Sequence, residues 1–340
     1  MSSRRADLDA IRIVSAALVV AIHVTAAAVR ERAAASELIT FSRALLDVAV
    51  PSFMAVAGVL AWGRGPGAGG WPAFLGRRFA GTGLPYLAWS GVFLVTGHLM
   101  SGRAYPDSVE SWGDTLFLGG AWYHLYFVPL VFMAYALAPL VRPLLKRHPT
   151  AFWLVVTLAC AAGRPLLPGQ IAGSVLLAKD VSLLVRYTPF VTLGAWFWLR
   201  EHKAAPWLRR WWPALLVGGG SMWGAQVTGA MRLPLPAAAS FGYYLAISAA
   251  LLGVFGLGAW IAQVAGRSAR RLAALADLTF GIYLAHPLAL VLWLRLAGTF
   301  APGRPLTAAW FVALTYAVVL GASWALARAL HAWKATRWMV

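Results

Sequence analysis

The chain has 340 residues, of which 61% are apolar and 12% are charged, and its mean hydropathy is +0.70. A soluble domain carries about a quarter charged residues, so this composition excludes an ordinary soluble protein and indicates that most of the chain lies in a membrane. The net charge of +18 would suit a nucleic-acid-binding protein, but the distribution of the cations explains it otherwise. The single cysteine, Cys160, excludes a disulfide within the chain.

Ten apolar stretches are long enough to cross a bilayer as helices, since one crossing needs about 20 mostly apolar residues. They lie near residues 11–29, 41–62, 82–100, 121–141, 150–167, 181–199, 212–230, 238–262, 276–297 and 307–330. The fifth and seventh are the weakest because Gly and Pro interrupt them. We therefore predict an all-α, polytopic bundle of about ten transmembrane helices, with residues 1–340 forming one membrane domain and no separate soluble domain.

The lysines and arginines divide unevenly between alternate connections. With the N-terminus in the cytoplasm, nineteen of the 29 fall on the cytoplasmic side, nine fall on the other side, and Arg186 falls within a helix. Cytoplasmic loops of membrane proteins carry such an excess of cations. We therefore expect both termini in the cytoplasm, the connection 101–120 outside, and cations that contact lipid headgroups and no nucleic acid.

The first predicted helix carries ionisable side chains, which are costly within a membrane and usually functional. His23 follows Arg12 by eleven residues, and at about 100° per residue both lie within about 20° of the same helix face, about 16 Å apart along the axis. Asp9, three residues before Arg12, can pair with it. The alternatives are that His23 only hydrogen-bonds a neighbouring helix and that Arg12 only sets the orientation of the chain.

Five segments share one ordered pattern. They are Leu-Asp-Ala-Ile-Arg at residues 8–12 followed by His23, the segment 50–58, the segments 77–79 and 84–90, the segments 123–127 and 139–140, and Phe-Gly-Ile-Tyr-Leu-Ala-His-Pro at residues 280–287. Together they resemble the acyltransferase-3 family of bacterial integral membrane O-acyltransferases, whose first helix carries an Arg, ten residues and then a His. The resemblance spans nearly the whole chain.

Two positions depart from the family pattern. Ala57 stands where a Ser is usual, and Gly81 stands where many members have a second Arg, three residues after Arg78. If that second arginine helps to hold the phosphates of coenzyme A, another cation must do so in this chain. The cations available on the predicted cytoplasmic side are Arg77, Arg142, Lys146 and Arg147.

The resemblance implies an O-acyltransferase that moves an acyl group from cytoplasmic acyl-coenzyme A to a hydroxyl. Acetyl is the acyl group that we expect. The acceptor would be a glycan, a lipid-linked sugar or a metabolite at the bacterial cytoplasmic membrane or on its outer side. His23 would be the general base, and Arg12 would orient the coenzyme A end of the donor. Arg77 and Arg78 would bind the phosphates, unless they are only topology signals.

The resemblance also implies which partners to expect. They are acyl-coenzyme A, the hydroxylated acceptor and the lipid bilayer. No permanently bound cofactor and no metal is expected, and a homo-oligomer is left open.

Three further residues are candidates for contact with substrate or for lining a pore: His124, His286 and Arg186. His124 would open the fourth helix from the outer face, where it would line the acceptor entrance or simply bond within the bundle. His286 would contribute from the ninth helix, unless a bend at Pro287 needs its hydrogen bond.

Arg186 would contact substrate or pair with an acid, and the partners that we predict for it are Asp47 and Asp180. Ten helices with buried His and Arg also suit a transporter or a glycan exporter, although no internal repeat typical of transporters is evident. The departure at Gly81 leaves a non-catalytic membrane sensor as a third hypothesis.

Overall fold

A computed structural model describes residues 5–31, 37–169, 171, 175–231, 236–300 and 309–340. These residues form helices and no β-strand, which confirms the all-α class. Their contacts divide the chain into two compact units. The first unit is Met1–Val56 with Arg200–Ala329, and the second unit is Ala57–Leu199 with Leu330–Val340. The single membrane domain stays a prediction.

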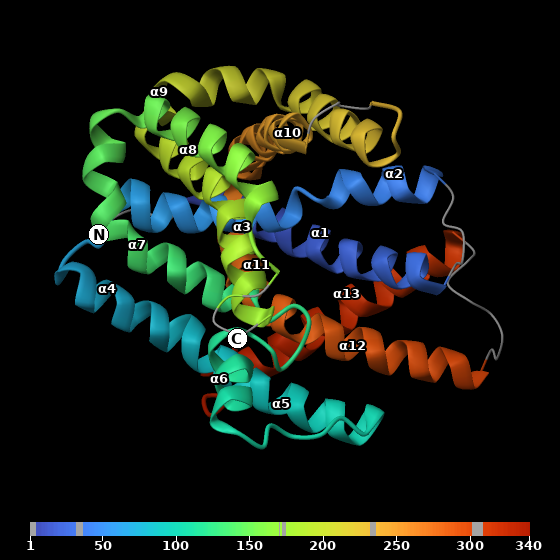
Figure 1. The fold of residues 1–340 in the computed structure, drawn as a ribbon. Helices are drawn as coiled ribbons and strands as arrows, with labels where there is room; N and C mark the ends of the chain where they lie inside the picture. Colours follow the sequence, from blue (N-terminus) through green and yellow to red (C-terminus); the bar gives the residue numbers. More distant parts are fainter. Residues whose placement is uncertain (1–4, 32–36, 170, 172–174, 232–235, 301–308) are drawn as a thin grey trace. The chain divides into compact units, whose positions relative to one another are not determined.

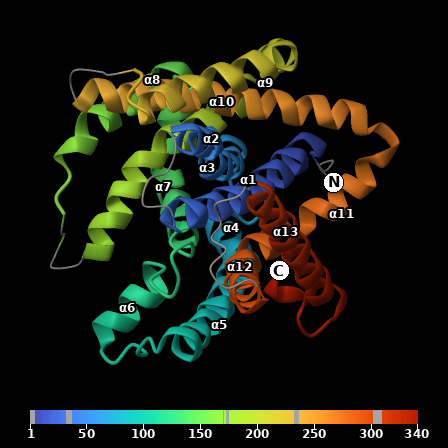
Figure 2. The same cartoon turned by 90° about the vertical axis from the view of Figure 1, so that its right-hand side faces the viewer.

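The first unit is built around helix α1, which packs against α2, α10, α11 and α12 (Figures 1 and 2). Its helices are α1 (Ala6–Glu31), α2 (Glu37–Leu46), the start of α3 (Ala49–Gly58), the later part of α9 (Val175–Val227), α10 (Pro236–Ala265), α11 (Ala269–Asp277), α12 (Thr279–Phe300) and most of α13 (Ala309–Ala332).

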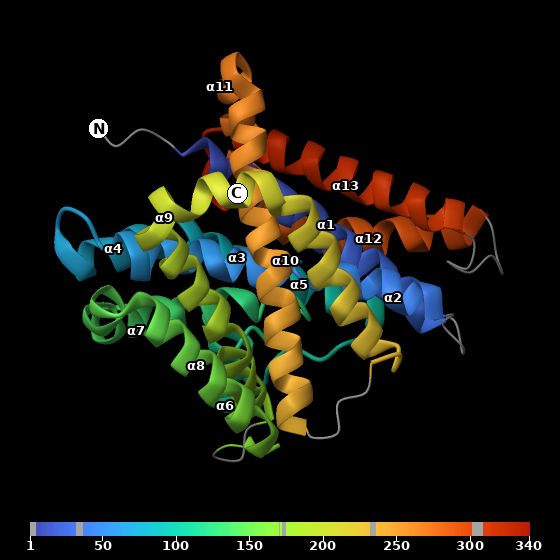
Figure 3. The same ribbon diagram turned by 90° about the horizontal axis from the view of Figure 1, so that it is seen from above.

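Small side chains and aromatic hydrogen bonds hold these helices together. A Cβ atom on Gly258 of α10 would lie 2.6 Å from Ile11 Cγ1 and 2.9 Å from the Asp7 carbonyl oxygen, so only glycine lets the α1 backbone approach this closely. Helices α12 and α13 lie side by side (Figure 3), and Trp293 Nε1 donates to Thr315 Oγ1 across them at 3.0 Å. Helix α1 is therefore tightly packed.

The second unit contains two short π-helical segments among its α-helices. Its elements are the π-helix η1 (Val59–Arg64), α4 (Gly70–Arg78), the π-helix η2 (Phe79–Gly83), α5 (Leu84–Ser101), α6 (Val109–Phe117), α7 (Phe127–Arg147), α8 (Pro149–Gly163), the first part of α9 and the 3₁₀-helix η5 (Arg337–Met339). Helix α7 packs against η1 and α8, and α5 packs against η2, α6 and η5. Trp62 Nε1 of η1 donates to the Ala134 carbonyl of α7 at 2.7 Å.

Eight helical segments among the described residues are long and apolar enough to cross a membrane. They are Ala6–Ala28, Thr40–Arg64, Gly70–Ser101, Phe127–Arg147, Pro149–Leu166, Ala238–Ala265, Thr279–Phe300 and Ala309–Ala332. These eight correspond to eight of the ten predicted stretches and confirm a polytopic helical membrane protein. The sixth and seventh predicted stretches lie largely on α9, a helix of 53 residues that is not among the eight.

The second predicted stretch, 41–62, is divided in the structure. Helix α2 ends at Leu46, a turn follows, and α3 begins at Ala49. Pro51 has no N–H with which to bond the carbonyl of Asp47, so the α-helical hydrogen bonds are interrupted there. The segment then changes to the π-helix η1 before it ends at Arg64.

Candidate functional site

Helix α1 carries both residues of the predicted Arg and His pair. It runs without a break from Ala6 to Glu31, which confirms that Arg12 and His23 lie on one helix. Asp9 Oδ1 lies 3.6 Å from Arg12 Nη1, which confirms that these two side chains pair. Asp9 is buried and Arg12 is half-buried, so the ion pair lies at the edge of the packed interior.

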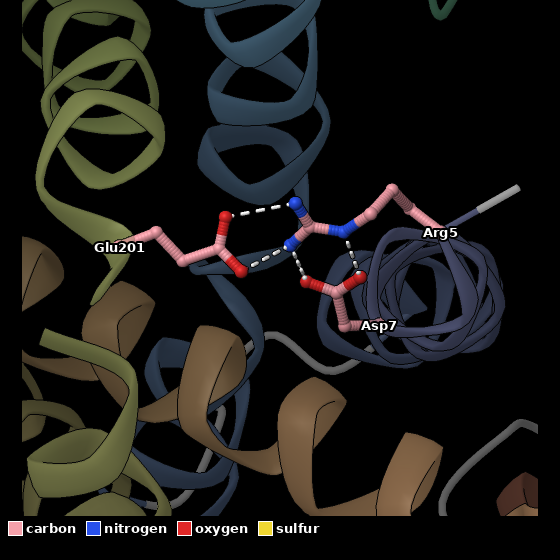
Figure 4. Close-up of polar contacts among 3 residues, drawn as sticks. All are labelled: Arg5, Asp7 and Glu201. Atoms are coloured by element: carbon pink, nitrogen blue, oxygen red, sulfur yellow. Dashed lines mark hydrogen bonds and ion pairs between the residues drawn. The ribbon is translucent and has the colours of Figure 1, made fainter. Parts of the chain in front are cut away.

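An ion-pair cluster fixes the beginning of α1 (Figure 4). The Arg5 guanidinium lies between two carboxylates: Nε donates to Asp7 Oδ1 at 2.8 Å, and Nη1 and Nη2 donate to Glu201 at 2.8 and 2.6 Å. The hydrogen bond with Asp7 raises the pKa of Arg5 above its ordinary value, so the guanidinium stays charged. Glu201 belongs to α9, and the cluster therefore joins α9 to the N-terminus of α1. This cluster was not predicted from the sequence, although an acid among the cations of residues 200–203 was a signal.

Two histidines from different helices stack in the first unit. The ring centroids of His23 on α1 and His286 on α12 are 5.0 Å apart, with an angle of 28° between the ring planes. His286 is 0% exposed, whereas His23 is half-buried. The Tyr283 ring lies 6.1 Å from that of His286 and 6.5 Å from that of Phe53. The structure thus brings together His23 and His286, which were predicted as separate candidates from the sequence.

His286 also satisfies a backbone group that a proline has left free. In an α-helix the carbonyl of residue 283 would accept from the N–H of residue 287, but residue 287 is Pro287. His286 Nδ1 lies 2.7 Å from the Tyr283 carbonyl oxygen. This contact fits the alternative in which a proline bend needs a hydrogen bond from His286. Pro287 itself is buried.

Three arginines surround a pocket of about 310 Å³ in the second unit. Arg64 ends η1, and Arg77 and Arg78 end α4. The pocket is lined by Leu60, Arg64, Gly65, Pro66, Gly67, Ala68, Phe74, Arg77 and Arg78. A π-helical segment adjoins the pocket residues on each side, and π-helical turns occur frequently at functional sites. The two predicted phosphate-binding residues therefore share one concave, cationic site.

The arginines of the pocket are held in different ways. Arg77 Nη2 donates to the Pro66 carbonyl at 3.0 Å and is otherwise exposed. The Arg78 guanidinium carbon lies 5.1 Å from the centre of the Phe74 ring and 6.0 Å from that of Tyr135, both within the range of cation–π attraction. Arg78 Nε is buried and has no hydrogen-bond partner among the residues that the structure describes. Arg78 is thus pre-oriented by aromatic rings, whereas Arg77 extends toward solvent.

Arg142 of α7 supports the loop that forms the pocket. Its Nη2 donates to the Arg64 carbonyl at 3.0 Å, at the end of η1. Gly65 has a positive φ of 86°, and a Cβ there would lie 2.5 Å from the Arg142 guanidinium carbon. Gly81, by contrast, borders open space, with no atom within 4 Å of a Cβ built there. Arg142, one of the cations predicted to be available on the cytoplasmic side, thus lies beside the loop that lines the pocket.

Comparison with known families supports the same chemistry. The model of the acyltransferase-3 domain, described as an acyltransferase domain, matches residues 5–328. The chain belongs to the acyltransferase-3 family. The curated proteins and the solved structures that were compared with it gave no match. Together with the eight apolar helices, the family identifies a multi-pass membrane acyltransferase.

His124 of this acyltransferase lies three residues before the start of the fourth predicted membrane helix, and its contact with the acceptor stays a prediction. Helix α7 begins at Phe127, and His124 lies in the preceding turns, 1% exposed and edge-on to Phe93 at 5.1 Å between ring centroids. Arg103 donates to the carbonyls of residues 120 and 121 at 2.9 and 3.0 Å, which satisfies them without a helix. His124 therefore belongs to the second unit and His23 to the first.

Arg186 of the acyltransferase lies over the ring of its neighbour Tyr187, 5.6 Å from the ring centre. Of the two acids predicted to pair with it, Asp47 accepts a hydrogen bond from Trp223 Nε1 at 2.8 Å. Asp180 is 1% exposed, and within the described part of the chain its Oδ2 has no hydrogen-bond partner. The role of Arg186 in substrate contact stays a prediction. Within the described ranges, no three His, Cys, Asp or Glu side chains cluster as metal ligands.

Proposed function

We propose that this acyltransferase moves an acyl group from cytoplasmic acyl-coenzyme A to a hydroxyl of a glycan, a lipid-linked sugar or a metabolite at the bacterial cytoplasmic membrane. The acyl group that we propose is acetyl. The observation that carries the proposal is the half-buried His23 on α1, which stacks on His286 of α12 and shares its helix with Arg12. A neutral imidazole is the side chain best suited to remove a hydroxyl proton near pH 7.

The reaction requires one proton acceptor and one leaving group. The hydroxyl oxygen forms a bond to the thioester carbonyl carbon while His23 takes the hydroxyl proton. The carbon–sulfur bond then breaks, and the coenzyme A thiolate leaves and takes the proton from His23. Arg12 would orient the coenzyme A end of the donor, because a guanidinium binds phosphate and carbonyl oxygens with several donors.

The pocket around Arg64, Arg77 and Arg78 supports a phosphate-bearing donor. Arginine is over-represented wherever proteins bind phosphate, because its planar fork can donate two parallel hydrogen bonds. The pocket volume of about 310 Å³ lies at the lower end of the range for small-molecule sites. It therefore suits a phosphorylated part of coenzyme A, and the positive-inside distribution of cations supports the expectation that it faces the cytoplasm.

Comparison of acylated products in cells tests this function. Mass spectrometry of glycans, lipids and secreted metabolites would compare cells that lack the gene and cells that express the wild-type protein or His23→Ala. We expect an acylated species only with the wild-type protein, at equal protein levels in the membrane. An unchanged set of acylated species in all three would contradict the proposed function.

The transporter and the sensor predict different results in the same cells. A glycan exporter would change the amount of a glycan outside the cell without changing its acylation. A non-catalytic sensor would leave both unchanged when His23 is replaced. No second function is proposed, because family membership favours acyl transfer over both alternatives.

A further inference from the structure

We propose that His286 is a positioning residue for His23 and that Pro287 sets its tautomer. The inference rests on the proposed function, in which His23 is the general base. It assigns no contact with substrate to His286, because that ring is 0% exposed while the His23 ring is half-buried. Of these two histidines His23 is the partly exposed one, so in this proposal His23 meets the hydroxyl and His286 acts through it.

Pro287 interrupts the backbone hydrogen bonds of α12. Pro287 lies within α12 and cannot donate to the Tyr283 carbonyl, which is the normal partner of its position in the helix. Within a membrane protein, a freed carbonyl must find another donor. His286 Nδ1, at 2.7 Å, is that donor. The sequence of residues 283–287 therefore favours a local hydrogen bond, from the His286 side chain to the Tyr283 backbone carbonyl.

The contact with the Tyr283 carbonyl also fixes the tautomer of His286. A carbonyl oxygen only accepts hydrogen bonds, so His286 Nδ1 must carry the hydrogen in this contact. In the neutral imidazole the other nitrogen, Nε2, then has the lone pair. The ring of His286 is thus fixed in position, orientation and tautomer by its own helix. It does not depend on substrate for any of the three.

Stacking then transmits the fixed position of His286 to His23. His23 lies against this fixed ring with centroids 5.0 Å apart and planes 28° apart. The Tyr283 ring lies 6.1 Å from that of His286 and stacks on Phe280, with centroids 6.0 Å apart and planes 12° apart, so the aromatic rings of α12 support one another. An exposed imidazole would rotate about two side-chain bonds. Stacking on a fixed ring restricts that rotation, and a base held in its reactive orientation transfers protons faster.

A double substitution separates this role from a purely structural one. Pro287→Ala restores the backbone N–H to the Tyr283 carbonyl and so removes the structural need for His286. In that background, His286→Ala should lower kcat, measured at a temperature where both variants are folded, by about ten- to a hundredfold, the size of loss known for groups that orient metal-binding imidazoles. The cavity that it leaves should lower the thermal midpoint as well, so kcat and not the midpoint is the deciding measurement. The KM for acetyl-coenzyme A should change by less than about twofold, because ground-state binding is not affected.

The comparison uses full-length protein in lipid vesicles, with acetyl-coenzyme A and an acceptor identified by mass spectrometry. If Pro287→Ala and the double variant have the same kcat, His286 is only structural and the inference is wrong. His286→Gln gives a second reading, since its amide can donate to the Tyr283 carbonyl but offers no ring to stack. Wild-type kcat in that variant would overturn the inference as well.

Two controls keep the outcomes distinct. Pro213→Ala removes an exposed proline from α9 in the same unit, and it should leave kcat unchanged. If wild-type protein transfers no acyl group from acetyl-coenzyme A, the proposed function fails, whatever the variants do. If the wild-type protein is active, the ratio of kcat between Pro287→Ala and the double variant tests His286 alone.

Discussion

Replacing Arg77 and Arg78 together by Ala removes two of the three arginines that line the pocket of the second unit. Arg77 is exposed, and an exposed ionic contact contributes about 0.2–1 kcal/mol. Arg78 is half-buried over Phe74, and a sheltered hydrogen bond to a charged group contributes about 1.5–3 kcal/mol. We therefore expect the double variant to lose about 2–4 kcal/mol of coenzyme binding. At 1.4 kcal/mol per tenfold, this raises Kd by about 30- to 700-fold.

Calorimetric titration of the purified protein with acetyl-coenzyme A measures this loss. Wild-type affinity should fall as salt is raised, because ions screen exposed charges beyond about 10 Å at 0.1 M, and the double variant should respond less. The matched control is Arg270→Ala with Arg271→Ala, an exposed pair on α11 that is also predicted to be cytoplasmic and lines no part of this pocket. An equal loss of affinity in both double variants, or none in either, would refute a specific phosphate site.

Three further predictions concern the scaffold and its orientation. Glu201→Gln keeps one hydrogen bond to Arg5 but removes the negative charge. Because the Glu201 side chain is about one-third exposed, thermal unfolding should show that the variant loses about 1 kcal/mol of stability. Unchanged stability would contradict a structural ion pair. Gly258→Val would force α1 and α10 apart, so size-exclusion chromatography should show aggregated or poorly inserted protein, whereas a normal profile would refute the close approach. Ala104→Cys in a Cys160→Ser background should react with an impermeant maleimide on intact cells, and reaction only after lysis would reverse the topology.

Hydropathy identified the helices well because a membrane leaves few choices. A crossing segment must be apolar and about 20 residues long, and eight of the ten predicted stretches are long, apolar helices in the structure. The course of the chain between them was less predictable. The break near Asp47 and the delayed start of α7 depend on a proline and on hydrogen bonds from Arg103, and average hydropathy does not register either.

The candidate site was only partly predictable. The helical period placed Arg12 and His23 on one helix, and the three-residue spacing gave the contact of Arg12 with Asp9. The stack of His23 on His286 joins residues that are far apart in the chain, and no local pattern specifies such a contact. Arg142 was only one of several available cations, because its support of the pocket depends on the positive φ of Gly65.

The central claim is that His23 is the general base of an acyl transfer from coenzyme A. The most direct test is the single-turnover rate of acyl transfer by His23→Gln in vesicles, measured against wild-type protein with equal acetyl-coenzyme A occupancy. A general base typically contributes about 10²–10⁴-fold, so the account predicts a loss of that size with nearly unchanged coenzyme binding. A His23→Gln protein that transfers the acyl group at a near-normal rate would contradict it.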